Sequence, residues 1–202
     1  MQGDIRVAEE IVETCRKLVE YRLTYASLGN VSVKHSGHIY ITPSGVRFDK
    51  ITPEQIVKVD MKGRVIEGRK PSVELPMHLE IYRSITNASA IIHAHSIYST
   101  TLGTLLGDLI FMNEEAEVFG LDIVPACMPA KHGTMELAKN VATVLKNRRA
   151  TIIPNHGVVV YGENLDEAFQ LLEILESLSK MKIMELMLRS RIVFATPPQF
   201  LF

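Results

Sequence analysis

Three histidines are the residues of this chain best suited to chemistry. His93 and His95 come at the end of the strand-forming run 90–92, and His156 follows a second such run, 151–153. Side chains alternate between the faces of a strand, so His93 and His95 can present both imidazoles to one point. A third imidazole from a neighbouring strand would complete three nitrogen ligands. Three protein ligands with an open fourth position are typical of catalytic zinc, so the spacing predicts a catalytic metal centre.

The elements that must position these histidines follow from the hydrophobic pattern. Apolar side chains recur at helical spacing over residues 4–22, and an alternating or continuous apolar pattern marks the strands. The predicted strands are the end of 25–33, then 38–41, 56–59, 64–66, 90–95, 122–124, 150–154 and 158–161. Further helices are predicted from Pro76 to about Ser84, after Ser96, over 134–146 and after Asn164, with Ser96, Thr134 and Asn164 as N-caps.

Composition limits the classes of function. The chain has 202 residues, of which 47% are hydrophobic and 22% charged, as expected for one globular domain. A net charge of −1 gives no basic field for nucleic acid or an anionic membrane. The sequence contains no apolar run of about 18 residues and no signal-peptide core. Two cysteines, Cys15 and Cys127, fit a reducing compartment, so we expect a cytoplasmic protein without nucleic-acid or membrane partners.

Five short motifs occur in order along the chain. They are Ser27-Leu28-Gly29-Asn30-Val31-Ser32, Ile41-Thr42-Pro43-Ser44-Gly45, Pro71-Ser72-Val73-Glu74, His93-Ala94-His95 and Asn155-His156-Gly157. Each motif alone is weak, but the ordered set resembles the class II aldolase/adducin family over roughly residues 5–185. Within that family, the resemblance is strongest to the branch that cleaves L-fuculose 1-phosphate.

The resemblance assigns a role to each motif. It implies one zinc ion per subunit, held by His93, His95 and His156. It implies that Glu74 is the catalytic acid/base and can also ligate the metal. It places the substrate phosphate at the Gly29-Asn30, Ser44-Gly45 and Ser72-Val73 turns. Backbone N–H groups of glycine-rich turns can cradle a phosphate, and Asn30, Ser44 and Ser72 add side-chain donors.

The implied reaction is reversible cleavage of a ketose 1-phosphate to dihydroxyacetone phosphate and an aldehyde such as lactaldehyde. Breaking a carbon–carbon bond next to a ketone leaves an enediolate, whose charge a Lewis-acidic metal stabilises. Glu74 would give a proton to the enediolate carbon in cleavage and remove it in condensation. That role favours a pKa of Glu74 above its free value. Partial burial raises this pKa, and zinc lowers it.

Other functions on the same scaffold stay open. L-Ribulose-5-phosphate 4-epimerases usually carry aspartate at the position of Glu74, so glutamate favours the aldolase. A methylthioribulose-1-phosphate dehydratase is a further alternative. A non-enzymatic adducin-like assembly module would have no need of three imidazoles beside a carboxylate.

Two departures from the aldolase pattern concern the substrate. Val73 replaces a serine, which removes one side-chain contact to phosphate. No tyrosine follows Tyr161, so the proton donor for the aldehyde half is unassigned. The other histidines, His35, His38, His78 and His132, are expected on the surface or on a helix face, and His132 has a contact with ligand as its alternative.

The predicted fold is a single α/β domain over residues 1–202, with residues 191–202 as a C-terminal tail. Its three layers are a largely antiparallel central sheet and flanking helices. The resemblance supplies the sheet topology, and it also implies a homotetramer with active sites between subunits.

Overall fold

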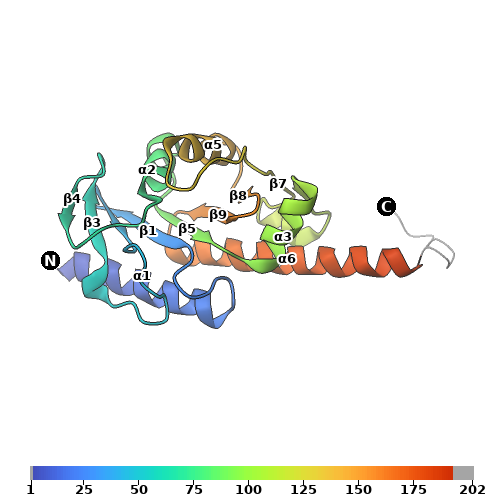
Figure 1. The fold of residues 1–202 in the computed structure, drawn as a ribbon, viewed down its shortest axis with the longest axis horizontal. Helices are drawn as coiled ribbons and strands as arrows, with labels where there is room; N and C mark the ends of the chain where they lie inside the picture. Colours follow the sequence, from blue (N-terminus) through green and yellow to red (C-terminus); the bar gives the residue numbers. More distant parts are fainter. Residues whose placement is uncertain (1, 193–202) are drawn as a thin grey trace.

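The computed structural model describes residues 2–192, which form helices and strands in alternation (Figure 1). The helices are α1 (Gln2–Glu20), α2 (Leu75–Ser84), α3 (Ile97–Leu106), α4 (Glu114–Val118), α5 (Met135–Leu145) and α6 (Leu165–Ile192), with a 3₁₀ turn at Pro53–Gln55. The strands are β1 (Asn30–His35), β2 (His38–Ile41), β3 (Val57–Asp60), β4 (Val65–Glu67), β5 (Ala90–Ala94), β6 (Leu109–Ile110), β7 (Ile123–Val124), β8 (Ala150–Ile153) and β9 (Gly157–Gly162).

The central sheet has seven strands in the order β4-β3-β2-β1-β5-β9-β8, and neighbouring strands are antiparallel. Tight turns connect β1 to β2 and β8 to β9, as antiparallel neighbours allow. Strand β5 enters between β1 and β9, far from its sequence neighbours. This insertion places the predicted His93-Ala94-His95 motif at the centre of the sheet.

Helices cover both faces of the sheet. Helices α2 and α5 lie on one face, and α1 and α6 lie on the other (Figure 1). Alternation along β5 divides the core accordingly: Ile91 packs in the cluster with α2 and α5, whereas Ile92 packs in the cluster with α1 and α6. His93 and His95 lie two and four residues after Ile91, so their side chains are on the same face of the sheet, which α2 covers.

The predicted fold class is confirmed: one α/β domain with an antiparallel sheet between helical layers. Strand β6 and helix α4 were not predicted, because two and five residues are too few to show a period. Thr134 and Asn164 cap helices as predicted, accepting from the N–H groups of Leu137 and Glu167.

Ser96 occupies the predicted N-cap of α3 but makes no capping bond with its side chain. The carboxylate of Glu176, on α6, instead accepts from the N–H groups of Tyr98 and Ser99. The prediction was wrong about the capping group because the acceptor comes from another helix, 77 residues away in the chain from Ser99.

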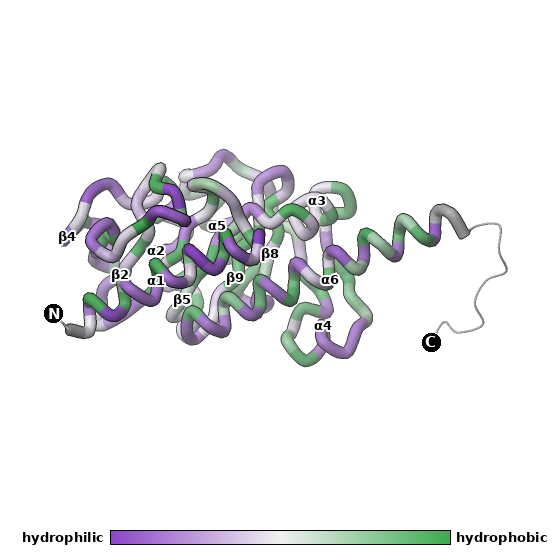
Figure 2. Tube along the Cα trace, turned by 90° about the horizontal axis from the view of Figure 1, so that it is seen from below, coloured by the Kyte–Doolittle hydropathy of each residue, from purple (hydrophilic) through white to green (hydrophobic). Residues whose placement is uncertain are grey.

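Helix α6 is the longest helix and extends past the sheet (Figures 1 and 2). It continues to Ile192, two residues into the predicted tail of 191–202, and the rest of that tail lies outside the described residues. Across residues 2–192, no helix combines the length and apolar character that crossing a membrane requires.

Candidate active site

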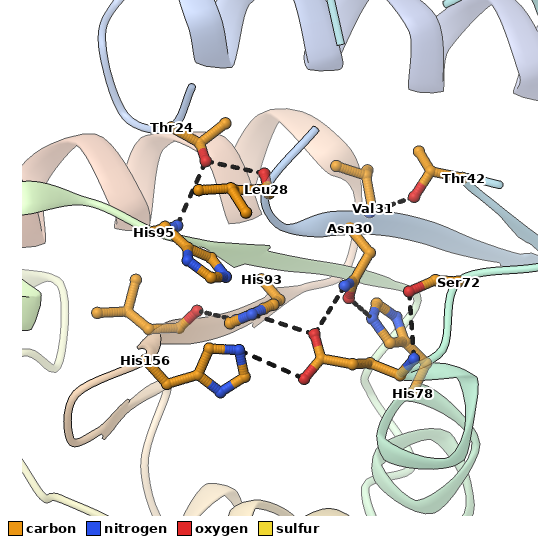
Figure 3. A network of polar contacts seen from close by, with 12 residues as sticks. Thr24, Leu28, Asn30, Val31, Thr42, Ser72, His78, His93, His95 and His156 are labelled. Atoms are coloured by element: carbon orange, nitrogen blue, oxygen red, sulfur yellow. Dashed lines mark hydrogen bonds and ion pairs between the residues drawn. The ribbon is translucent and has the colours of Figure 1, made fainter. Parts of the chain in front are cut away.

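The three predicted histidines converge at one end of β5 (Figure 3). His93 lies in β5, His95 follows its last residue, and His156 lies in the turn between β8 and β9. The three ring centroids are 4.8–5.0 Å apart. One ring nitrogen from each histidine lies within 4.8 Å of the other two. The pairing of β5 with β9 thus joins two motifs that are about sixty residues apart in the sequence.

Glycine at position 157 permits this close approach of β9 to β5. A Cβ atom on Gly157 would lie 2.9 Å from Cε1 of His93 and 2.5 Å from the carbonyl oxygen of Ala94. Both distances are well inside van der Waals contact. The glycine of the Asn-His-Gly motif therefore makes room for the imidazole of His93.

The hydrogen bond of His93 shows which of its nitrogens is free. Nδ1 lies 2.9 Å from the carbonyl oxygen of Val158, which can only accept, so Nδ1 carries a proton. In the neutral ring Nε2 is then an unprotonated acceptor, and it lies 3.1 Å from Oε2 of Glu74, a second acceptor. Nε2 of His93 and Oε1 of Glu74 are buried and lack a hydrogen-bond partner among the described residues.

Two facing acceptors need a cation between them, supplied by a metal ion or by an added proton on the imidazole. Three imidazoles and a carboxylate match the ligands of catalytic zinc and of related divalent metals. A backbone carbonyl that holds the far nitrogen of a ligating histidine is common at such centres. The arrangement of donors therefore fits a metal ion.

Burial keeps the neighbouring histidines neutral. Desolvation, together with smaller contributions from the adjacent His93 and His156, lowers the pKa of His95 to about 3. Desolvation also lowers the pKa of His156, with a further contribution from His93. Neutral imidazoles at neutral pH have the lone pairs that metal ligation requires.

Glu74 lies immediately before α2, and its side chain is buried beside the histidines. Its Oε2 accepts a hydrogen bond of 2.8 Å from Nδ2 of Asn30, and its Oε1 lies 3.6 Å from Nε2 of His156. Burial raises the pKa of Glu74, as expected, but nearby groups, chiefly His93 and the Asn30 amide, lower it more, so the net pKa is below the ordinary value.

One cavity of about 370 Å³ gathers nearly all the predicted site residues. Its volume suits a small ligand. It is lined by Ser27, Leu28, Gly29, Asn30, Pro43, Ser44, Gly45, Ser72, Val73, Glu74, His95, His132 and His156. His93 is fully buried behind this wall. The structure thus places the predicted metal, acid/base and phosphate residues at a single opening.

The turns around the cavity offer a specific set of donors. The N–H groups of Ser44 and Ser72 already bond to the carbonyls of Lys70 and Thr42. The N–H groups of Gly45 and Val73 have no partner among the described residues. Oγ of Ser72 accepts from the N–H of Glu74, which leaves its hydroxyl hydrogen for another acceptor. A bound anion would therefore meet two backbone N–H groups and serine hydroxyls.

Two of the other histidines lie close to the site. His78 lies on α2 but is fully buried, with its ring bonded to Asn30 and Ser32. Its spacing of four from Glu74 is the signal that places both on one helix face. His132 is exposed in the wall of the cavity, which fits its alternative interpretation as a ligand contact. The amide of Asn30, a predicted phosphate donor, is paired with Glu74 and His78.

Comparison with known proteins gives one consistent family. The family model described as "Class II Aldolase and Adducin N-terminal domain" matches residues 9–183. The L-fuculose phosphate aldolase of Escherichia coli strain K12 is 32% identical over 176 residues, which cover 87% of this chain and 82% of that protein. The L-fuculose phosphate aldolase of Methanococcus vannielii is 38% identical over 175 residues, covering 86% of this chain and 93% of that protein.

Solved structures agree with the sequence comparisons. An L-fuculose 1-phosphate aldolase structure superposes with a TM-score of 0.86 at 34% identity, covering 96% of this chain and 91% of that chain. The L-fuculose-1-phosphate aldolase of Thermus thermophilus gives a TM-score of 0.84 at 30% identity, covering 95% and 98% of the two chains.

Proposed function

The chain belongs to the class II aldolase and adducin family and is an aldolase, a lyase, and on this premise we propose that it reversibly cleaves a ketose 1-phosphate of the L-fuculose 1-phosphate type. The products are dihydroxyacetone phosphate and an aldehyde such as lactaldehyde. This chain matches most of the length of the relatives named for this activity, which supports assigning the same activity to it.

In this proposal, zinc is held by His93, His95 and His156, with Glu74 as a further ligand while substrate is absent. The observation that carries the proposal is the unpartnered pair of buried acceptors, His93 Nε2 and Glu74 Oε1, beside two further imidazoles. When bound, the metal would supply Lewis acidity toward the negative charge of the enediolate.

The protein side chains would bind the phosphate and move the proton. The phosphate occupies the cradle of Gly29, Asn30, Ser44, Gly45, Ser72 and Val73, which all line the cavity. Direct bonds come from the N–H groups of Gly45 and Val73 and from the serine hydroxyls. Asn30 contributes its remaining amide hydrogen, since its other polar positions bond Glu74 and His78.

Glu74 is the acid/base of the proposed reaction. In condensation, its carboxylate removes a proton from the carbon of dihydroxyacetone phosphate that will attack the aldehyde. In cleavage, the hydroxyl of the aldehyde half loses its proton and its oxygen becomes the aldehyde carbonyl as the carbon–carbon bond breaks. The electron pair of that bond stays with the dihydroxyacetone phosphate half, whose carbon takes a proton from protonated Glu74, and the proton released by the hydroxyl balances the one that Glu74 takes up from solvent. The lowered pKa favours the ionised form of Glu74 that can accept a proton, and it also makes the carboxylate a weaker base than a free glutamate.

Coupled detection of dihydroxyacetone phosphate from L-fuculose 1-phosphate tests the proposal. We expect release by the zinc-loaded protein, loss on chelation, and a steep fall in Glu74→Gln. Glu9→Gln, at an exposed position on α1, is the matched control and should stay active. A single isomeric product would instead identify an epimerase, and a single dehydrated product a dehydratase.

We further propose a cytoplasmic homotetramer of this single domain, with active sites between subunits. Large apolar side chains are exposed on α3 and the segment that follows: Ile97, Leu105, Leu106, Ile110, Met112 and Val118. Figure 2 shows hydrophobic segments beside α4 and along the end of α6. Apolar exposure of this extent is typical of a subunit interface. Light scattering would measure the mass of the assembly. The two cysteines are buried free thiols, which fits a reducing compartment.

A further inference from the structure

A buried chain of hydrogen bonds leads from α2 and β1 to Glu74. Oγ of Ser32 lies 2.8 Å from the hydroxyl of Tyr82 and 2.6 Å from Nδ1 of His78. Nε2 of His78 lies 2.5 Å from Oδ1 of Asn30, whose Nδ2 donates to Glu74. Figure 3 shows the imidazole of His78 between Asn30 and the start of α2.

The sheet register explains this geometry. Asn30 and Ser32 are two residues apart on β1, so both side chains point to the face that α2 covers. His78 lies one helical turn after Glu74 and presents its ring to that face. Its two nitrogens therefore bridge Asn30 and Ser32, and both nitrogens are occupied.

The direction of each bond follows from the groups involved. Nδ2 of Asn30 donates to Oε2 of Glu74 at 2.8 Å, so Oδ1 of the same amide is directed toward His78. Oδ1 can only accept, so Nε2 of His78 carries the proton. Burial lowers the pKa of His78 to about 3, so the ring is neutral and Nδ1 accepts from the Ser32 hydroxyl. Tyr82 then donates to Ser32 at 2.8 Å, in preference to the carbonyl oxygen of Ser89 at 3.5 Å.

We propose that His78 is a positioning residue for the reaction: its Nε2–H holds the Asn30 amide in the orientation that donates to Glu74. The two ends of an amide have nearly the same shape, so packing alone does not choose between them. The reversed amide would place Oδ1 of Asn30 against the carboxylate and repel it. His78 removes this alternative, because a reversed amide would also place its NH₂ group against the Nε2–H.

This inference rests on the proposed role of Glu74, and a pair of amide substitutions tests it. The amide of His78→Gln reaches the position of Nε2 and can still donate to Asn30. The amide of His78→Asn reaches only the position of Nδ1, beside Ser32. We expect kcat near the wild-type value for His78→Gln, and a fall of about 10- to 100-fold for His78→Asn. KM should rise by much less than kcat falls, because Asn30 is only one of the phosphate donors and the others are untouched.

Control measurements separate positioning from folding. His38→Asn, at the turn between β1 and β2, makes the same substitution away from the cavity and should leave kcat unchanged. Thermal unfolding and zinc content are measured for every variant. Equal kcat values for folded His78→Asn and His78→Gln would overturn the proposal, while the loss in Glu74→Gln would still support the aldolase.

The tautomer of His78 gives a readout that needs no turnover. Ring ¹⁵N shifts of the histidine-labelled full-length protein, assigned by the spectrum of His78→Gln, should show a neutral ring protonated on Nε2 from pH 5 to pH 8. A ring protonated on Nδ1, or a charged ring, would overturn the proposal even if the protein proved inactive on ketose 1-phosphates.

Discussion

Replacement of Glu176 by alanine is predicted to destabilise the protein, although Glu176 is remote in sequence from the active-site residues. The carboxylate of Glu176 is buried between α6 and α3, where it accepts bonds from the N–H groups of Tyr98 and Ser99 at 2.8 and 2.9 Å. It also accepts from the Ser99 hydroxyl at 2.7 Å. Glu176→Ala removes all three bonds and leaves two N–H groups at the start of α3 without an acceptor.

The expected loss is set by those unpaired groups. A hydrogen bond to a charged group contributes about 1.5–3 kcal/mol, and loss of an N-cap costs about 0.5–2 kcal/mol. The three bonds share one carboxylate, so their effects do not add. Removing a buried charge also recovers part of its desolvation cost. We therefore expect Glu176→Ala to lower the free energy of unfolding by about 3 kcal/mol, and Glu176→Gln, which keeps one acceptor, by about half as much.

Urea unfolding of the metal-free protein measures this effect. For a domain of this size, 3 kcal/mol corresponds to a fall in Tm of about 6–12 °C. Glu9→Ala, at an exposed position on α1, is the control and should stay within about 0.5 kcal/mol of wild type. If Glu176→Ala were as stable as Glu9→Ala, the carboxylate would not be the cap of α3.

Three other predictions concern the metal centre and its surroundings. Gly157→Ala should weaken zinc binding about tenfold or more in a chelator competition, because its Cβ displaces His93; unchanged affinity would show that β9 can shift. Zinc at 100 times its Kd should raise the free energy of unfolding by about 2.7 kcal/mol in wild type and by much less in His95→Gln, by urea titration. Buried His78 has a pKa of about 3, against 6.5 in the unfolded chain. Its neutral ring therefore stabilises the folded protein above pH 6.5, and this contribution is lost as the pH falls toward 3. Between pH 6.5 and pH 5, the free energy of unfolding of His78→Gln should therefore fall by about 1.5–2 kcal/mol less than that of the wild type.

The sequence predicts most of the fold because most elements are long enough to show a period. The hairpin of β3 and β4 and the helices α1 and α5 were all expected within a few residues of their observed ends. The position of β5 between β1 and β9 depends on pairing between distant segments, which local patterns do not encode. The family resemblance supplied that order.

The candidate site was predictable in composition but not in its connections. The types and spacing of the three histidines indicated metal chemistry, and the family resemblance added Glu74. The buried role of His78 was missed, because one histidine on a helix gives no sign of which partner its ring will meet. The net pKa of Glu74 is also beyond the sequence, because it depends on how near His93 and Asn30 lie once the chain has folded.

The precision of the site depends on the register of β5. Asn30 pairs directly with His93 across the sheet, and His93 pairs with Val159 on the other side. A slip of one residue would turn the imidazole of His93 toward α1 and α6, away from Glu74. Such a slip would also exchange the core positions of Ile91 and Ile92, each of which is fully buried against a different helical layer. The hydrophobic core that stabilises the sheet therefore also fixes which way the metal-binding imidazole points.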